Sequence, residues 1–218
     1  MVPDLGGDAI HIFQTNAATG ALTACPDAKT AAGDGPRHGA WWAPTAGSTA
    51  GQMLYTVNEL GNSVSAWQVS YPSGSGCLTL TKTQTLSVFA PGTSAPSRSQ
   101  PVKAAEVHVA GNYLYAAVRN DQLFGTQQDS LVRYNIDSST GAISYAEAVN
   151  SHSWYPRTFS INKAGTLIAM GGQTSSNVAI LSRDPSTGKV GGLLASLAVG
   201  QKGTDGGEDG LSSVVWTS

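Results

Sequence analysis

The sequence has few charged residues and no long apolar run, and these two shortages exclude several classes of protein. Lysine and arginine number 12 against 14 aspartates and glutamates, so the chain of 218 residues has a net charge of −2. Binding to a nucleic-acid backbone needs a basic surplus, so no nucleic-acid partner is expected. No stretch approaches the roughly 20 apolar residues that span a bilayer, so no membrane partner is expected either. We expect a soluble protein, either cytoplasmic or secreted.

Cysteine is also scarce, since only Cys25 and Cys77 are present. Two cysteines are too few for a disulfide scaffold, and neither lies in a C-x-x-C motif. Two free thiols are the simpler interpretation, whereas a bridge between them would indicate an oxidising compartment. Motifs of the G-x-S-x-G, Walker and H-E-x-x-H types are absent as well. We therefore expect no serine nucleophile, no cofactor and no metal ion.

Short alternating or apolar runs, bounded by Gly, Asn, Asp, Ser and Pro, fill the chain, and long helical periodicity is missing. Four segments share one pattern, in which a strand ends in a bulky residue and a turn glycine follows seven residues later. These pairs are Phe13 and Gly20, Trp67 and Gly74, Tyr134 and Gly141, and Leu181 and Gly188. A fixed spacing that recurs four times predicts a repeat architecture.

Two further apolar runs precede three of the four repeats and complete units of four antiparallel strands. The first runs are PRHGAW, AAEVHV and PRTFSI, and the second are LYTVNE, LYAAVRN and LIAMGGQ. The predicted fold class is all-β, a β-propeller with about four blades of four antiparallel strands. The expected units are the outer half of a blade at 1–30, complete blades at 36–90, 102–150 and 155–200, and a ring-closing strand at 211–216.

The innermost strands of a propeller line its central channel, so polar residues from successive blades converge there. Glu106 and His108 lie two residues apart and therefore on one face of their strand. Arginine binds carboxylate or phosphate, while glutamate or histidine moves a proton. The pattern predicts acid–base chemistry on a small anionic substrate. The candidate catalytic residues are Glu59, Arg37, Arg119, His38, Glu106 and His108.

The same residues also allow a purely structural explanation. Arg37 and Arg157 occupy equivalent positions, and a repeated residue often stabilises the blade itself. Glu59, Glu106 and Arg119 would then form salt bridges between neighbouring blades, and the protein would be a non-catalytic binding module. Charged groups around an open cleft favour the enzyme, whereas charged groups paired without a cavity favour the binding module.

Nearly the whole chain carries motifs in a fixed order: VPDLGGDAIHIF, GPRHGAW, LYTVNELGNSVSAW, AAEVHVAGNYLYAAVRN and PRTFSINKAGTLIAMGGQTSSNVAIL. This series resembles the lactonase-type seven-bladed β-propellers, which include bacterial 6-phosphogluconolactonases and fungal carboxy-cis,cis-muconate cyclases. The terminal DGLSSVVW is similar to the closing strand of fungal members. The resemblance implies lactone hydrolysis, or lactone-forming cycloisomerisation, of a small carboxylated or phosphorylated substrate in the central channel.

The resemblance also implies which residues form the site. Arg37 of GPRH and Arg119 of VRN would hold anionic groups and the developing oxyanion, and Glu59 of VNE would move the proton with help from a histidine. Glu106 and His108 match the E-V-H-V segment and would line the same channel. About four of seven blades would be present, with the chain truncated at its N-terminus and starting within a blade. An inactive fragment and self-association through open propeller edges are the remaining alternatives.

Overall fold

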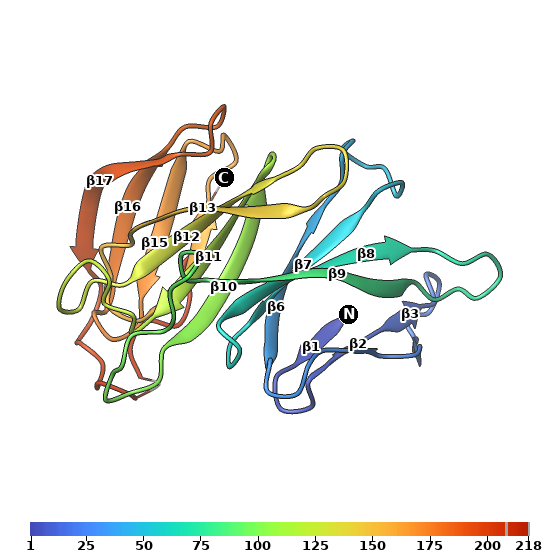
Figure 1. Ribbon diagram of the computed structural model, residues 1–218, viewed down its shortest axis with the longest axis horizontal. Coiled ribbons are helices and arrows are strands. Elements are labelled where there is room, and N and C mark those ends of the chain that lie inside the picture. The colour runs from blue at the N-terminus through green and yellow to red at the C-terminus, as the bar shows by residue number, and fades with distance from the viewer. Residues whose placement is uncertain (208, 218) are drawn as a thin grey trace.

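The computed structural model describes residues 1–207 and 209–217 and contains seventeen strands there. Three four-stranded antiparallel sheets follow one another along the chain, and each has its strands in sequence order. Figure 1 shows the three sheets standing side by side as blades, with the N-terminal strands at one side. The predicted all-β fold of antiparallel four-stranded blades is confirmed. None of the described segments forms a helix long and apolar enough to cross a membrane.

Each of the three complete blades is a meander in which every strand pairs with the next one along the chain. The first blade consists of β6 (Pro36–Trp42), β7 (Met53–Asn58), β8 (Ser63–Ser70) and β9 (Thr79–Ser87). The second consists of β10 (Lys103–Ala110), β11 (Tyr113–Arg119), β12 (Ser130–Ile136) and β13 (Ile143–Asn150). The third consists of β14 (Pro156–Ile161), β15 (Leu167–Gly172), β16 (Asn177–Arg183) and β17 (Val190–Ala198).

The N-terminal segment, expected to be the outer half of a blade, forms five short strands in two small sheets. One sheet has the order β1-β2-β5, and the other pairs β3 with β4. The structure thus adds β1, whose pairing with β2 was not expected from the sequence. The strands are β1 (Val2–Asp4), β2 (Ala9–His11), β3 (Phe13–Thr15), β4 (Leu22–Ala24) and β5 (Ala28–Lys29).

Residues 211–216 form no strand, at variance with the ring-closing strand predicted there. The segment instead lies against the third blade, where Trp216 Nε1 donates a hydrogen bond to Ser160 O at 2.9 Å. Leu211 and Val214 cover Gly171 of β15. A closing strand forms only where an open blade edge offers it a ladder of hydrogen bonds, and this segment covers β14 and β15 without such a ladder.

The cores lie between neighbouring blades, where apolar side chains of facing sheets pack together. Two buried tyrosines of second strands reach across these interfaces. The hydroxyl of Tyr55 donates to Gly141 O at 2.8 Å, and that of Tyr115 donates to Gly188 O at 2.5 Å. The second strand of one blade therefore holds the outer turn of the next blade.

This packing explains why glycine recurs in the outer turns. Gly141 and Gly188 have φ angles of 72° and 69°, a left-handed conformation that favours glycine. A Cβ at Gly188 would overlap the ring of Tyr113, and one at Gly141 would lie 2.5 Å from Met53 Cγ. Gly20 has the same backbone conformation, but no heavy atom lies within 4 Å of its Cβ position.

Gly188→Ala is expected to lower the free energy of unfolding more than Gly20→Ala. A left-handed conformation costs an L-residue about 1–2 kcal/mol at either position. Overlap with the ring of Tyr113 adds about 1–3 kcal/mol at Gly188 alone. Urea denaturation of the two variants measures the difference, and equal losses would contradict the role of this turn in blade packing.

Cys25 and Cys77 form a disulfide bridge, with their Cα atoms 5.8 Å apart. The simpler interpretation of two free thiols is therefore wrong. Cys25 follows β4 and Cys77 precedes β9, so the bridge joins the N-terminal strands to the first blade. It lies within an apolar cluster that includes Ile10 of β2 and Trp67 of β8. The fold brings the two cysteines together across 52 residues of sequence, and nothing in their local sequence indicates this pairing.

The outer strand of the third blade leaves apolar side chains exposed. Leu194 and Leu197 of β17 are 60% and 68% exposed, although a propeller blade usually packs both faces against neighbours. Large contiguous apolar patches on protein surfaces often serve as interaction sites. Self-association through open propeller edges stays a prediction, and β17 is the strand where we expect it.

Candidate active site

The innermost strand of every complete blade has a register shift at the same place. In β6, Pro36 pairs with Asn58 and His38 pairs with Val57, so Arg37 is an extra residue between them. The same irregularity falls between Ala104 and Val107 in β10, and between Pro156 and Thr158 in β14. A β-bulge bends its strand and re-aims side chains. Arg37, Glu106 and Arg157 all lie within these bulges.

Glu59 is the centre of a buried network of charges. Its Oε2 lies 2.8 Å from Arg119 Nη2 and 3.0 Å from Arg37 Nε, and its Oε1 lies 3.3 Å from Lys103 Nζ. Burial alone would raise the pKa of Glu59, but the positive charges of Arg119, Lys103 and Arg37 outweigh it and hold this pKa below its usual value. Glu59 is therefore an anion at neutral pH.

The two arginines of this network are fixed by further contacts. Arg119 is 1% exposed, donates to Ala104 O at 3.3 Å, and has its guanidinium 5.1 Å from the centre of the Tyr155 ring. Arg37 Nη1 donates to Ala105 O at 2.6 Å. Burial, together with the charges of Arg119 and Arg157, lowers the pKa of Arg37, although its guanidinium stays charged. The network holds Arg37 in one orientation.

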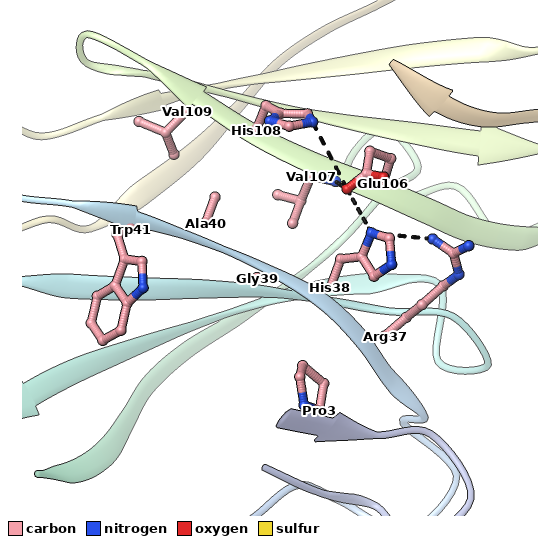
Figure 2. Close-up of a pocket in the computed structure, with 10 residues that line it drawn as sticks. All are labelled: Pro3, Arg37, His38, Gly39, Ala40, Trp41, Glu106, Val107, His108 and Val109. Atoms are coloured by element: carbon pink, nitrogen blue, oxygen red, sulfur yellow. Dashed lines mark hydrogen bonds and ion pairs between the residues drawn. The ribbon is translucent and has the colours of Figure 1, made fainter. Parts of the chain in front are cut away.

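Glu106 lies between two histidines, as Figure 2 shows. Its Oε1 is 2.7 Å from His38 Nδ1 and 3.9 Å from His108 Nε2. A carboxylate accepts hydrogen bonds, so in this contact His38 Nδ1 is the donor, and in the neutral imidazole the other ring nitrogen, Nε2, is then an acceptor. Burial lowers the pKa of His108, although the charge of Glu106 opposes this, so His108 is neutral at pH 7. Its ring packs edge-on against Phe159.

Four of the six predicted residues line an open cleft of about 480 Å³: Arg37, His38, Glu106 and His108. Trp41, which is 42% exposed, forms an apolar wall of the same cleft. Glu59 and Arg119 do not line it and lie behind Arg37. The site therefore has a front layer that faces the cleft and a charged layer that supports it.

The sequence missed two residues of this arrangement, Lys103 and Tyr155. Lys103 pairs with Arg119 in the β10–β11 ladder, so an explicit register of the two strands would have found it. Tyr155 precedes β14 in a loop, and no sequence signal links it to Arg119. Within residues 1–207 and 209–217, no group of three or more His, Cys, Asp or Glu side chains is arranged to hold a metal ion.

Comparison with known proteins identifies relatives of this propeller. The family model described as "Lactonase, 7-bladed beta-propeller" matches residues 1–204. A protein of Arthroderma benhamiae, named probable 6-phosphogluconolactonase, is 33% identical over 192 residues, which cover 87% of this chain and 45% of that protein. The 6-phosphogluconolactonase of Formosa agariphila is 28% identical over 201 residues, covering 90% of this chain and 50% of that protein.

A solved structure shares the fold as well. The periplasmic gluconolactonase PpgL of Pseudomonas aeruginosa superposes with a TM-score of 0.73 at 25% identity, covering 93% of this chain and 51% of that one. The chain thus spans about half the length of the curated relatives it matches. Because the family model covers most of the chain, this protein belongs to the lactonase family of seven-bladed β-propellers.

Proposed function

We propose that this chain provides the catalytic cleft for the hydrolysis of a lactone of a small phosphorylated or carboxylated sugar acid. The observation that carries the proposal is the imidazole of His38, which is held by Glu106 and faces an open cleft beside Arg37. The relatives named as gluconolactonases support hydrolysis rather than lactone-forming cycloisomerisation.

In the proposed reaction, His38 is the proton acceptor and Arg37 stabilises the oxyanion. His38 Nε2 takes a proton from a water molecule as the water oxygen forms a bond to the lactone carbonyl carbon. The guanidinium of Arg37 stabilises the resulting oxyanion. The tetrahedral intermediate then breaks the bond from its carbon to the ring oxygen, and the imidazolium returns the proton to that oxygen. The product is the open hydroxy acid.

We assign the proton transfer to His38 rather than to Glu59, which the sequence argument had favoured. Glu59 contacts three cations, and its lowered pKa makes it a weak base. It lies outside the cleft, so it acts as a positioning residue that holds Arg37. Arg119 has the same role from the other side of Glu59.

The charges around the cleft favour an anionic substrate. Among the residues that the structure describes, three cationic side chains, Arg37, Arg119 and Lys103, lie around two carboxylates, Glu59 and Glu106. The surplus of positive charge attracts a carboxylate or phosphate group and speeds its approach. Arginine binds either group through paired N–H donors.

The non-catalytic binding module keeps one observation in its favour, because Glu59 pairs with three cations in the way that a structural role predicts. The open cleft lined by Arg37 and two histidines favours the enzyme. Activity measurements separate the two functions, since a binding module would release no acid from a lactone.

His38→Gln is expected to lower kcat/KM on 6-phosphogluconolactone or gluconolactone by about 10³-fold, the usual contribution of a positioned general base. His152→Asn is the matched control and should keep the wild-type rate, because this histidine does not line the cleft and its φ of 53° suits asparagine. The assay follows acid release at constant pH. An inactive wild-type chain, or full activity in His38→Gln, would overturn the proposal.

The disulfide favours one of the two expected locations. Disulfide bridges persist mainly in oxidising compartments, so the bridge between Cys25 and Cys77 supports a secreted protein rather than a cytoplasmic one. The Pseudomonas aeruginosa neighbour is named as periplasmic, and the periplasm is such a compartment.

A further inference from the structure

Strained backbone gathers in two loops that contact each other, one joining β11 to β12 (120–129) and one joining β13 to β14 (151–155). A left-handed conformation is costly for most residues other than glycine, and residues held in it cluster at functional sites. The structure describes eight non-glycine residues with a positive φ, and the two loops contain five of them: Asn120, Gln122, Gln127, His152 and Tyr155. This concentration of strain requires contacts that hold it in place.

The carboxyl group of Asp129 holds two of these strained residues. Its Oδ1 accepts a hydrogen bond from the Gln122 amide at 2.8 Å, and its Oδ2 accepts one from the Tyr155 amide at 2.6 Å. Those two residues have φ angles of 48° and 61°. The main chain of Asp129 also pairs with Ser151 and Ser153, at 2.9 and 3.1 Å, and Asp129 is fully buried. One buried residue therefore fixes the backbone of both loops.

The ring of Tyr155 lies against Arg119. Tyr155 is 4% exposed, and the centre of its ring is 5.1 Å from the guanidinium carbon of Arg119. Arg119 Nε is buried and has no hydrogen-bond partner among the residues that the structure describes. A buried N–H without an acceptor is costly, and the face of an aromatic ring attracts a cation. The ring thus gives Arg119 a contact that its hydrogen bonds do not supply.

Two ion pairs connect this arginine to the cleft. Arg119 Nη2 lies 2.8 Å from Glu59 Oε2, and the same oxygen lies 3.0 Å from Arg37 Nε. Arg37 lines the cleft, as Figure 2 shows, and it is the residue proposed to stabilise the oxyanion. A shift of Arg119 would therefore move the carboxylate oxygen that orients Arg37.

We propose that Asp129 and Tyr155 are positioning residues for lactone hydrolysis, an inference that rests on the proposed function. Asp129 holds the left-handed backbone of Tyr155, and the ring of Tyr155 holds Arg119. Through Glu59, this arginine keeps Arg37 in the orientation that the oxyanion needs. Neither Asp129 nor Tyr155 lines the cleft. If the two loops only stabilised the blades, loss of the ring would weaken the fold and leave the chemical step of the folded protein unchanged.

Tyr155→Met tests the ring, because methionine fills the space with a flexible apolar side chain but has no aromatic face. We expect kcat on 6-phosphogluconolactone or gluconolactone to fall by about 10- to 100-fold with KM nearly unchanged, since Arg37 acts on the oxyanion in the transition state. Tyr155→Phe keeps the ring and should retain kcat within about threefold of the wild type. A wild-type kcat in folded Tyr155→Met would overturn the proposal.

Tyr145→Met is the matched control. Tyr145 is half-buried and packs edge-on against Tyr134, with the ring centres 5.9 Å apart. Its loss should lower thermal stability and leave kcat unchanged. Should Tyr155→Met fail to fold, 3,5-difluorophenylalanine in place of Tyr155 decides, because fluorine weakens the negative ring face but hardly changes the size of the ring. Its kcat should lie at least about threefold below that of Tyr155→Phe, and equal values would refute the contact with Arg119.

Asp129→Asn tests the other positioning residue. The side-chain amide would point N–H donors at one of the two main-chain amides that Asp129 accepts from, so one of the strained loops would lose its hold. We expect kcat to fall about tenfold or more. An unchanged kcat would remove Asp129 from the positioning role.

A measurement without substrate separates this inference from the proposed function. The Nε–H signal of Arg119 in ¹H–¹⁵N NMR spectra should shift in Tyr155→Met and in Asp129→Asn, and it should stay in place in Tyr145→Met. An Arg119 signal that is the same in all three variants would overturn the positioning role even in an active enzyme. A wild-type chain that hydrolyses no lactone, but whose Arg119 signal shifts as expected, would contradict the proposed function while supporting the hold of Tyr155 on Arg119.

Discussion

Glu59→Gln is expected to lower the free energy of unfolding by about 3–5 kcal/mol, the usual loss when one partner of a buried ion pair is removed. Glutamine would leave the positive charges of Arg119, Arg37 and Lys103 facing one another without an anion between them. The largest part of the cost comes from Arg119, because this side chain is 1% exposed and water cannot replace the contact that its charge loses. Urea denaturation at pH 7 measures the loss.

Glu147→Gln is the matched control for this variant. Glu147 pairs with Arg133 at 2.8 Å, but its side chain is 33% exposed, so its loss should cost about 1 kcal/mol or less. The difference between wild type and Glu59→Gln should also depend on pH. Because folding lowers the pKa of Glu59, its stabilisation is complete above about pH 4.5 and disappears as the pH falls through the folded-state pKa. A Glu59→Gln loss as small as that of Glu147→Gln would contradict the buried network.

Removing the disulfide should have an effect of similar size. The bridge closes a loop with a sequence separation of 52 residues, and the chain-entropy relation assigns such a loop about 4 kcal/mol. The N-terminal strands form only short sheets of their own. We therefore expect them to detach from the first blade before the rest of the protein unfolds. The Cys25→Ala, Cys77→Ala double variant and the wild type treated with reductant should both show the loss in urea denaturation.

The double variant supplies its own control, because added reductant should leave its stability unchanged. Amide hydrogen exchange adds a local measurement. Protection of β2 should fall before protection of β11 changes, since β11 lies at the centre of the second blade. Equal stability with and without the bridge would show that the apolar cluster around Ile10 and Trp67 alone holds the N-terminal strands.

The sequence predicted the blades well because their signal is local and repeated. The spacing from Tyr134 to Gly141, and from Leu181 to Gly188, reflects a physical requirement, namely a left-handed turn pressed against the preceding blade. Each repeat supports the interpretation of the others, so four weak patterns become one strong prediction. The prediction of antiparallel four-stranded sheets followed from this repeat and from the two apolar runs that precede it.

The arrangement of the site was only partly predictable. Glu59 and Arg119, which follow or end second strands, contact each other and Glu59 contacts Arg37, but strand periodicity cannot tell which of these residues face the cleft and which lie behind it. That Glu106 and His108 lie near each other follows from the sequence, because the two residues share a face of one strand. The hydrogen bond from His38 crosses between blades, and its 2.7 Å length depends on a packing that no local pattern encodes.

Predictions that depended on distant contacts failed. The bridge between Cys25 and Cys77 requires two loops to meet through tertiary packing, so their local context favoured free thiols. The apolar run at 211–216 has the composition of a strand, but a strand also needs a neighbouring edge, and the segment packs on β14 and β15 instead.

The repeated bulge in the innermost strands places one residue of each strand outside the hydrogen-bond ladder of its blade. The extra residue, Arg37 in β6 and Arg157 in β14, has no partner of its own in the ladder, so its side chain can change without breaking the pairing of the blade. The plan of the blade is thus held by the paired residues, and the charged network is held by the residue that lies outside the ladder. Substitution of Arg37 should therefore leave the hydrogen-bond ladder of β6 and β7 intact, and the stability that is lost should come from the broken ion pair with Glu59 and not from the sheet.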